Sequence, residues 1–379
     1  MAERRVGELS RRRLLMTIGA GLVTACTQGC HNRAHIRLTS AATSTEPAPP
    51  AATAPAPPSE ATPPTMASPD ILPCEAWGAR NPSEAVTVLD ARPTKIVVHH
   101  TATPNLNEVS HDDLITLATS IQTWHMDHNG WIDTGQHFTI NRGGLAAEGR
   151  HRSLETVTAG VSFVEGTHCI DQNDVSIGIE NQGTYTEVDP PDALLGTLAA
   201  LLAYCAGQYQ MSPAQIYGHR DFNDTACPGD KLYALLPTLR RRVGQLMGTP
   251  VDQAAASPPV WPLLRPGKTG PAVAAAQHLL RAAGQPQVDV TGTFDSDTVS
   301  AVTAFQHARG LVPSGVVAGG SWPLLVRSIA NDPTGEATAA VRVLRAHTGS
   351  PTNAEGEQAL NSTATTTTAW QRLLDAADS

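Results

Sequence analysis

The chain has 379 residues, of which 41% are hydrophobic, 16% charged and 4% aromatic, and its formal net charge is −9. At roughly 150 residues per domain, this length predicts two or three domains that can each bury a core. The negative charge argues against a nucleic-acid partner, because proteins that bind nucleic acids usually present a basic surface. The spacing of the six cysteines contains no CxxC pair, which excludes a zinc ribbon or a thioredoxin-type site.

Residues 1–26 have the features of an export signal. The motif SRRRLL at 10–15 resembles the twin-arginine consensus, and the apolar stretch 14–25 is too short to span a bilayer core of about 30 Å. The stretch ends in VTAC, which resembles a bacterial lipobox, so we expect Cys26 to carry a lipid. This predicts export by the twin-arginine route and a lipid anchor at the outer face of the cytoplasmic membrane or in the cell envelope, facing the wall. An ordinary soluble secretion signal is the alternative.

Residues 27–70 are predicted to be a disordered linker. Positions 41–69 consist almost entirely of Ala, Pro, Thr, Ser and Glu, with nine prolines and no aromatic residue. Such a segment cannot bury enough apolar surface to offset its ordering entropy, and proline favours an extended chain. It is expected to be a tether.

Residues 71–247 have the pattern of an α/β domain. A β-branched run at 96–100 predicts a strand, and further strands are expected at 135–141 and 175–180. Helical spacing of apolar residues predicts a helix through Leu114, Leu117, Ile121 and Trp124, a second helix after Pro190 and Pro191, and a last helix over 230–246, interrupted or begun at Pro237.

Three residues of this domain have side chains suited to zinc. His99, His219 and Cys227 offer imidazole and thiolate groups, and three protein ligands with one water define an open, catalytic zinc site. Side chains alternate across a strand, so His99 and His100 face opposite ways and only one of them can enter a given site. Each residue alone is weak evidence, since single histidines and cysteines are more often buried core residues.

Four separated motifs supply the context for these residues. They are VVHHTAT at 97–103, WHMDHNGWIDTGQHFTINRGG at 124–144, NDVSIGIENQG at 173–183 and GHRDFNDTACPG at 218–229. Together they resemble the zinc-dependent N-acetylmuramoyl-L-alanine amidases that share a fold with peptidoglycan recognition proteins. The resemblance implies a central mixed β-sheet flanked by helices, Zn²⁺ bound by His99, His219 and Cys227, and peptidoglycan as the substrate. Non-catalytic proteins of this fold usually lack the cysteine, which this chain keeps.

The same resemblance suggests which residues act on the substrate. Many family members place a tyrosine near the zinc where this chain has Gln136, which cannot serve as a base. Glu180 resembles instead the catalytic glutamate of another amidase branch, and strand alternation puts it on the face opposite Ile177 and Ile179. Thr225 occupies a position near the substrate carbonyl and is expected to donate a hydrogen bond. A solvent-facing glutamate is the alternative for position 180.

Other residues have supporting or structural interpretations. His137 is expected beside the site as a support rather than a ligand. The residues that could line a glycan groove are Trp124, Trp131, Asn141 and Arg142, although Trp124 lies on an apolar helix face that favours the core. Arg220 and Asp221 are expected to brace their loop. Export permits a disulfide among Cys74, Cys169 and Cys205, of which Cys74–Cys205 is favoured, although the sequence does not fix the pairing.

The C-terminal third contains a repeat. After a predicted linker at 248–260, residues 261–328 resemble the small three-helix peptidoglycan-binding domain, with a helical dimerisation module as the alternative. Shifting the sequence by 65 residues aligns it with itself, so that Leu279 meets Leu344 and Phe305 meets Trp370. Residues 329–379 are therefore expected to be a degenerate second copy that packs against the first.

The leading hypothesis is an exported, lipid-anchored zinc amidase that cuts between N-acetylmuramic acid and L-alanine in peptidoglycan, acting as a monomer. A non-catalytic lipoprotein that recognises peptidoglycan or muropeptides is the alternative, and Gln136 is the feature in its favour.

Overall fold

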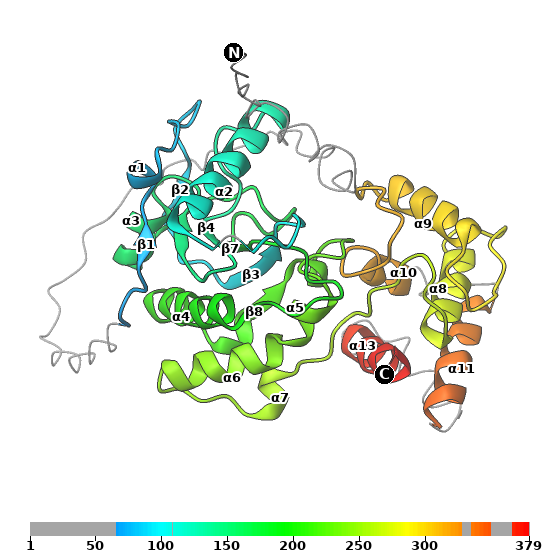
Figure 1. The fold of residues 1–379 in the computed structure, drawn as a ribbon. Helices are drawn as coiled ribbons and strands as arrows, with labels where there is room; N and C mark the ends of the chain where they lie inside the picture. The colour runs from blue at the N-terminus through cyan, green and yellow to red at the C-terminus, as the bar shows by residue number, and fades with distance from the viewer. Residues whose placement is uncertain (1–65, 108, 328–334, 350–365, 379) are drawn as a thin grey trace, which may run out of the picture.

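The computed structural model describes residues 66–107, 109–327, 335–349 and 366–378, which form a β-sheet domain and a helical C-terminal module (Figure 1). The predicted export signal, the lipid site at Cys26 and the predicted linker up to residue 65 lie outside the described residues. Within the described part, no helix combines the length and the apolar character needed to cross a membrane.

A mixed sheet forms the centre of the first domain, as predicted. Its order among the described residues is β1 (Ile71–Leu72), β5 (Ala146–Glu148), β4 (Phe138–Ile140), β7 (Ser176–Asn181), β3 (Lys95–His100) and β8 (Ile216–Gly218). The pair of β4 and β5 is antiparallel, and the other neighbours are parallel. Strands β2 (Val88–Leu89) and β6 (Phe163–Val164) form a separate antiparallel pair.

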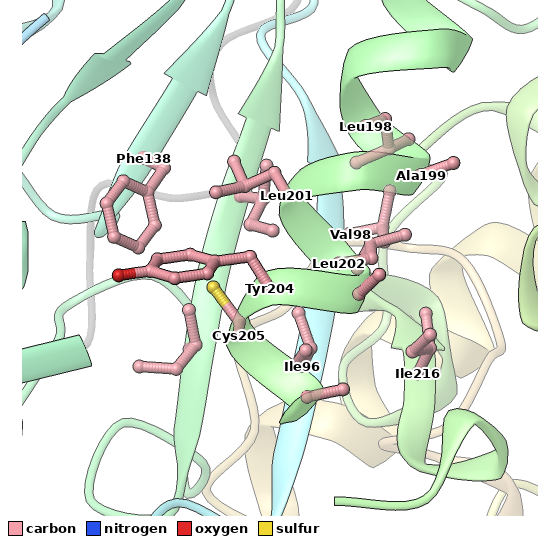
Figure 2. Packing of buried hydrophobic residues seen from close by; sticks show 14 of the residues in the cluster. Ile96, Val98, Phe138, Leu198, Ala199, Leu201, Leu202, Tyr204, Cys205 and Ile216 are labelled. Atoms are coloured by element: carbon pink, nitrogen blue, oxygen red, sulfur yellow. The ribbon is translucent and has the colours of Figure 1, made fainter. Parts of the chain in front are cut away.

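One face of this sheet packs on the hydrophobic core. The inward side chains of β3 and β7, among them Ile96, Val98 and Ile179, are buried against α4 (Asp192–Tyr209) and its neighbours, as Figure 2 shows for Ile96 and Val98. Because side chains alternate along a strand, His99 and Glu180 point to the opposite face. The sheet therefore separates a dry core from a second face that carries the polar groups.

The remaining helices of this domain include the two others that were predicted, near 114–124 and over 230–246, and three short helices that were not predicted. The predicted ones are α2 (His111–Thr123) and, over 230–246, α5 (Asp230–Ala234) and α6 (Leu236–Leu246), and the others are α1 (Cys74–Trp77), α3 (Ser153–Ala159) and α7 (Gln253–Ala256). The predicted helix over 230–246 breaks just before Pro237, because proline is tolerated in the first turn of the new helix. The predicted linker at 248–260 contains α7, whose Ala256 carbonyl accepts a 2.8 Å hydrogen bond from buried Arg240 on α6.

The expectation that Trp124 belongs to the core was wrong. The α-helix ends at Thr123, and residues 124–128 form a π-helical turn that leaves Trp124 39% exposed. Trp124 keeps α-helical dihedrals, and the most deeply buried positions of α2, which run through Leu114, Ala118 and Gln122, lie on a different side of the helix from position 124. The exposed Trp124 ring stacks on His128 with a centroid separation of 3.8 Å.

The favoured disulfide was also wrong. Cys74 and Cys205 are free thiols that belong to two different hydrophobic clusters, one beside α1 and α2 and the other between the sheet and α4. Burial raises the pKa of both thiols, which keeps them protonated and unreactive. They contribute as small apolar side chains.

The C-terminal module has helices in both segments that were predicted to be copies. Helices α8 (Pro271–Ala282), α9 (Ser296–Ala308) and α10 (Trp322–Arg327) form the first, and α11 (Glu336–Thr348) and α13 (Thr366–Asp378) belong to the second. Leu279 and Leu344, which the 65-residue shift aligns, are both buried in one shared core, and so are the aligned Phe305 and Trp370. The prediction that the second copy packs against the first is therefore confirmed.

Candidate metal centre

The three predicted metal ligands converge at the carboxyl ends of two neighbouring parallel strands. His99 lies near the end of β3, His219 follows β8 directly, and Cys227 lies at the end of the same loop. Their ligand atoms all lie within 4.8 Å of one another, and the His99 Nδ1 to Cys227 Sγ distance is 3.7 Å. Tetrahedral zinc with ordinary bond lengths separates nitrogen and sulfur ligands by about 3.6 Å, so this donor set fits the ion.

Burial keeps the two predicted histidine ligands in the neutral form that a metal requires. Burial lowers the pKa of His99 well below its usual value and lowers that of His219 to about 4, so both rings are neutral. The backbone N–H of His100 donates a 3.3 Å hydrogen bond to Cys227 Sγ, which favours a negatively charged sulfur. The His100 ring faces the other side of the sheet, where its Nδ1 accepts from the N–H of Tyr185.

His168 supports His99. Its Nδ1 lies 3.0 Å from His99 Nε2, and its own Nε2 lies 3.4 Å from the carbonyl oxygen of Ser176. Both contacts are hydrogen bonds when His99 Nε2 donates to His168 Nδ1 and His168 Nε2 donates to the carbonyl oxygen of Ser176. In that arrangement the Nδ1 of His99 keeps its lone pair for the metal, which is the usual role of a second hydrogen bond on a ligating histidine.

The His168 ring packs against the face of the sheet at Gly178, where no side chain projects. A Cβ atom on Gly178 of β7 would lie 2.5 Å from His168 Cγ, so the ring fits only because glycine is there. His137 lies on the other side of this ring, with a centroid separation of 5.5 Å. Its Nδ1 accepts from the N–H of Gly178 and its Nε2 donates to Val164 O. His137 thus contacts the residue that contacts a ligand.

Asn223 supports His219 as His168 supports His99, by accepting a hydrogen bond from its Nε2. Its Oδ1 lies 3.0 Å from His219 Nε2, and the same oxygen accepts from the N–H of Ile170 at 3.1 Å. This leaves the Nδ1 of His219 for the metal. The loop between β6 and β7 therefore supports both predicted histidine ligands, His99 through His168 and His219 through Asn223.

Glu180 lies next to the ligand cluster. It pairs in register with His99 on one side and with Thr139 on the other, so the three side chains share a face of the sheet. Its Oε2 atom is buried and has no hydrogen-bond partner among the described residues, and burial raises the pKa of Glu180 to about 8. A carboxyl group in this state can accept a proton near neutral pH.

Gln136 and Thr225 are two further predicted site residues, and each is engaged in a hydrogen bond within the domain. Gln136 is buried and donates to Thr139 Oγ1 at 2.8 Å, while its Oε1 is buried without a partner in the described part of the chain. Thr225 Oγ1 accepts from the N–H of Cys227 at 3.2 Å. Since that hydroxyl accepts from the backbone, its own proton remains available to a ligand.

Asn141 and Arg142 support the loop that follows β3. Fully buried Asn141 donates to Ser110 O, and the Arg142 guanidinium donates to Leu106 O and to Asn105 Oδ1. Neither contacts a metal ligand through a hydrogen bond of the described residues. A role of these two residues in binding glycan stays a prediction.

Arg220 and Asp221 brace their loop, as predicted. Arg220 forms a 2.5 Å ion pair with Asp230 and lies 3.6 Å from the centre of the Tyr233 ring. Asp221 accepts from the N–H of Gly218 at 2.9 Å and from the Tyr233 hydroxyl. These contacts fix the start of the loop that runs from His219 to Cys227.

Comparison with known proteins agrees with the family resemblance of the four sequence motifs. A family model described as N-acetylmuramoyl-L-alanine amidase matches residues 89–230, and a model of a peptidoglycan binding domain matches residues 269–318. Peptidoglycan recognition protein 1 of Bos indicus is 32% identical over 142 residues, which cover 37% of this chain and 69% of that protein. The chain belongs to the peptidoglycan recognition protein and N-acetylmuramoyl-L-alanine amidase family. Residues 71–247 are hereafter called the amidase domain.

Other relatives match the amidase domain across a smaller share of their own length. Peptidoglycan recognition protein 3 of Mus musculus is 28% identical, over 46% of this chain and 47% of that protein. The N-acetylmuramoyl-L-alanine amidase of Homo sapiens is 30% identical, over 46% of this chain and 29% of that protein. The chain therefore spans less than half the length of these two relatives.

Two supporting residues of the amidase domain were missed in the sequence. Asn223 follows His219 by four residues, a spacing that brings side chains together on a helical turn and could have revealed the pair. His168 gave no such signal, because its contact with His99 spans 69 residues of chain. The glycine in SIGIEN was the available hint that a side chain packs flat against β7.

We expect His168→Ala to weaken metal binding by about 10- to 100-fold, because the ring that orients His99 is lost. His168→Asn should recover part of this affinity, since an amide oxygen can accept the same proton. Competition titration with a chromophoric chelator measures the effect. His307→Ala, at an exposed site on α9, is the control and should leave the affinity unchanged. Equal metal affinity of the wild type and His168→Ala would show that His168 does not support a metal ligand.

Proposed function

We propose that the chain hydrolyses, with bound zinc, the amide bond between N-acetylmuramic acid and L-alanine of the peptidoglycan stem peptide. The observation that carries this proposal is the convergence of His99, His219 and Cys227 on one point beside Glu180. Family membership supports peptidoglycan as the substrate class. Three protein ligands, with no fourth in the group found among the described residues, are typical of catalytic rather than structural zinc.

Glu180 is suited to move the proton in this reaction. Bound zinc supplies Lewis acidity toward the scissile carbonyl and lowers the pKa of water. The carboxylate of Glu180 takes a proton from the attacking water and then delivers it to the amine of the departing L-alanine, so that protons balance over the cycle. Its unpartnered Oε2 is available for that proton, and a positive charge at the ligand cluster favours the ionised form.

Thr225 is suited to stabilise the carbonyl oxygen as charge develops on it. The backbone N–H of Cys227 donates to the Thr225 hydroxyl oxygen, so the hydroxyl proton is available for the substrate. A donor held in place before the reaction is more effective than water, because it need not reorient. These contacts support the proposed roles of Thr225 as the hydrogen-bond donor and Glu180 as the base.

The C-terminal module is proposed to hold the amidase domain at its polymeric substrate. A wall-binding module raises the local concentration of the attached enzyme without changing its chemistry. Export by the twin-arginine route and a lipid on Cys26 would place the chain, as a monomer, in the envelope that contains this polymer. The resemblance of residues 1–26 to a lipoprotein signal supports this location.

A second candidate function is recognition of muropeptides without cleavage. Gln136 favours it, because it replaces a tyrosine and is engaged with Thr139. The three ligands and Glu180 favour the enzyme. The two functions differ in whether purified peptidoglycan is cut.

Digestion of purified peptidoglycan tests the proposal directly. The full chain should release stem peptides with a free L-alanine amine and leave glycan with unsubstituted muramic acid, both identified by mass spectrometry. A chelator should stop the reaction by removing the metal, and added Zn²⁺ should restore it. Cleavage inside the peptide, or cleavage that a chelator does not affect, would contradict the proposed reaction.

A further inference from the structure

The loop 219–227 connects two of the three proposed metal ligands, and the C-terminal module contacts it at its centre. His219 begins this loop and Cys227 ends it, and apart from one short 3-10 turn it has no regular structure. Its own hydrogen bonds include Arg220 N–H to Cys227 O and Asn223 N–H to His219 O. Among the described residues, however, no side-chain hydrogen bond of Asp224 stays within this loop, so the position of this carboxylate depends on its neighbours.

Asp224, in the middle of this loop, is bound entirely by the C-terminal module. One carboxylate oxygen accepts from the N–H of Ala318 at 2.8 Å and of Ser321 at 2.9 Å. The other accepts from the Ser321 hydroxyl at 2.7 Å and from Gln306 Nε2 at 3.2 Å. A carboxylate that replaces its water with four donors is held strongly, because bonds to an ionised acceptor are stronger than neutral ones.

The backbone of the two parts also meets directly. Gly319 N–H donates to Arg220 O at 2.9 Å, next to the ion pair of Arg220 with Asp230. A Cβ atom on Gly319 would lie 2.1 Å from the carbonyl oxygen of Asp221, which no real side chain can do. These contacts of Asp224 and Gly319 are called the docking contact. Figure 1 shows α10 facing the amidase domain on this side.

We propose that the C-terminal module is a structural part of the metal centre, because its docking contact fixes the loop that carries His219 and Cys227. This inference rests on the metal site of the proposed function but adds a second role to a wall-binding module. Asp224 follows Asn223, which holds His219, and precedes Thr225, the proposed donor. Movement of Asp224 would therefore displace the support of one ligand and the donor beside the other.

The proposal implies reciprocal coupling between the metal and the module. If docking raises metal affinity by a given factor, metal binding must strengthen docking by the same factor. We therefore expect the two parts to unfold together when metal is bound. A module attached merely by a linker would unfold independently and leave the metal affinity unchanged.

Gly319→Ala in the full chain tests this inference, because it disturbs the docking contact without altering the amidase domain. We expect a roughly tenfold loss of Zn²⁺ affinity in a chelator competition and two separate transitions in calorimetric unfolding. Gly196→Ala is the matched control. Its added Cβ, in the second turn of α4, would approach no atom closer than Arg242 Nη2 at 4.0 Å, so it should keep the wild-type affinity and a single transition.

Ser321→Ala is a milder second variant if Gly319→Ala does not fold. It removes one donor to Asp224, and its effects on stability and metal affinity should be smaller than those of Asp224→Ala and non-additive with them in a double-mutant cycle. Unchanged metal affinity in Gly319→Ala with separated transitions would overturn the proposal. Additive effects of Ser321→Ala and Asp224→Ala would overturn it as well, by showing that the contact is not made. Both readouts are independent of turnover, so they remain decisive even if the chain cuts no peptidoglycan.

Discussion

Cys227→Ala is expected to lose Zn²⁺ binding by at least about 100-fold while the protein stays folded. Each ligand of a protein zinc site contributes several kcal/mol, so removal of the thiolate leaves two neutral imidazoles that bind the ion weakly. Cys227 lies outside the buried core clusters, so the fold does not depend on its packing. Chelator competition and circular dichroism measure the two parts of this result.

Cys205→Ala is the control, because it should lower the stability of the protein and leave its metal affinity unchanged. Its thiol is fully buried between the sheet and α4, so truncation should reduce stability by about 1 kcal/mol and leave metal affinity and turnover unchanged. Cys227→Asp should recover part of the affinity, since carboxylate oxygen is also a zinc ligand. Wild-type affinity in Cys227→Ala would show that the thiolate does not bind the ion.

The sequence predicted those strands and helices in which apolar residues recur at a regular spacing. The strand at 96–100 and the helix after Pro191 lie where apolar spacing put them, and alternation correctly separated Glu180 from Ile179. The metal ligands were predictable for another reason. Four motifs in one order identify the family, and the family supplies the positions of His99, His219 and Cys227.

The supporting contacts were not predictable because they join segments that are distant in sequence. His168 contacts His99 over Gly178, where a side chain would block it, and Asp224 contacts Ser321, which lies 97 residues further along the chain. Neither pair leaves a periodic signal in either segment. Trp124 was misplaced because the most deeply buried positions of α2 run through Leu114, Ala118 and Gln122, away from position 124, and Cys74 and Cys205 were paired although they belong to separate clusters.

Glu180→Gln is expected to reduce turnover by about 10²- to 10⁴-fold, because an amide of the same shape cannot accept the proton of the attacking water. Metal affinity should stay within about twofold, since Glu180 is not a ligand and the substitution is isosteric. Glu187→Gln, on an exposed stretch, is the matched control and should change neither quantity. Turnover that survives Glu180→Gln would exclude this carboxylate as the base.

The same variant gives a second test through stability in the presence of a chelator. Burial raises the pKa of Glu180 from 4.5 to about 8, so the folded state disfavours the ionised form. The contribution of Glu180 to the stability of the metal-free wild type therefore falls as the pH rises from about 5 to 8, whereas Glu180→Gln has no charge to bury there. We expect the melting temperature of Glu180→Gln to exceed that of the wild type by more at pH 8 than at pH 5. An equal difference at both pH values would show that the carboxyl group is not buried in the metal-free protein.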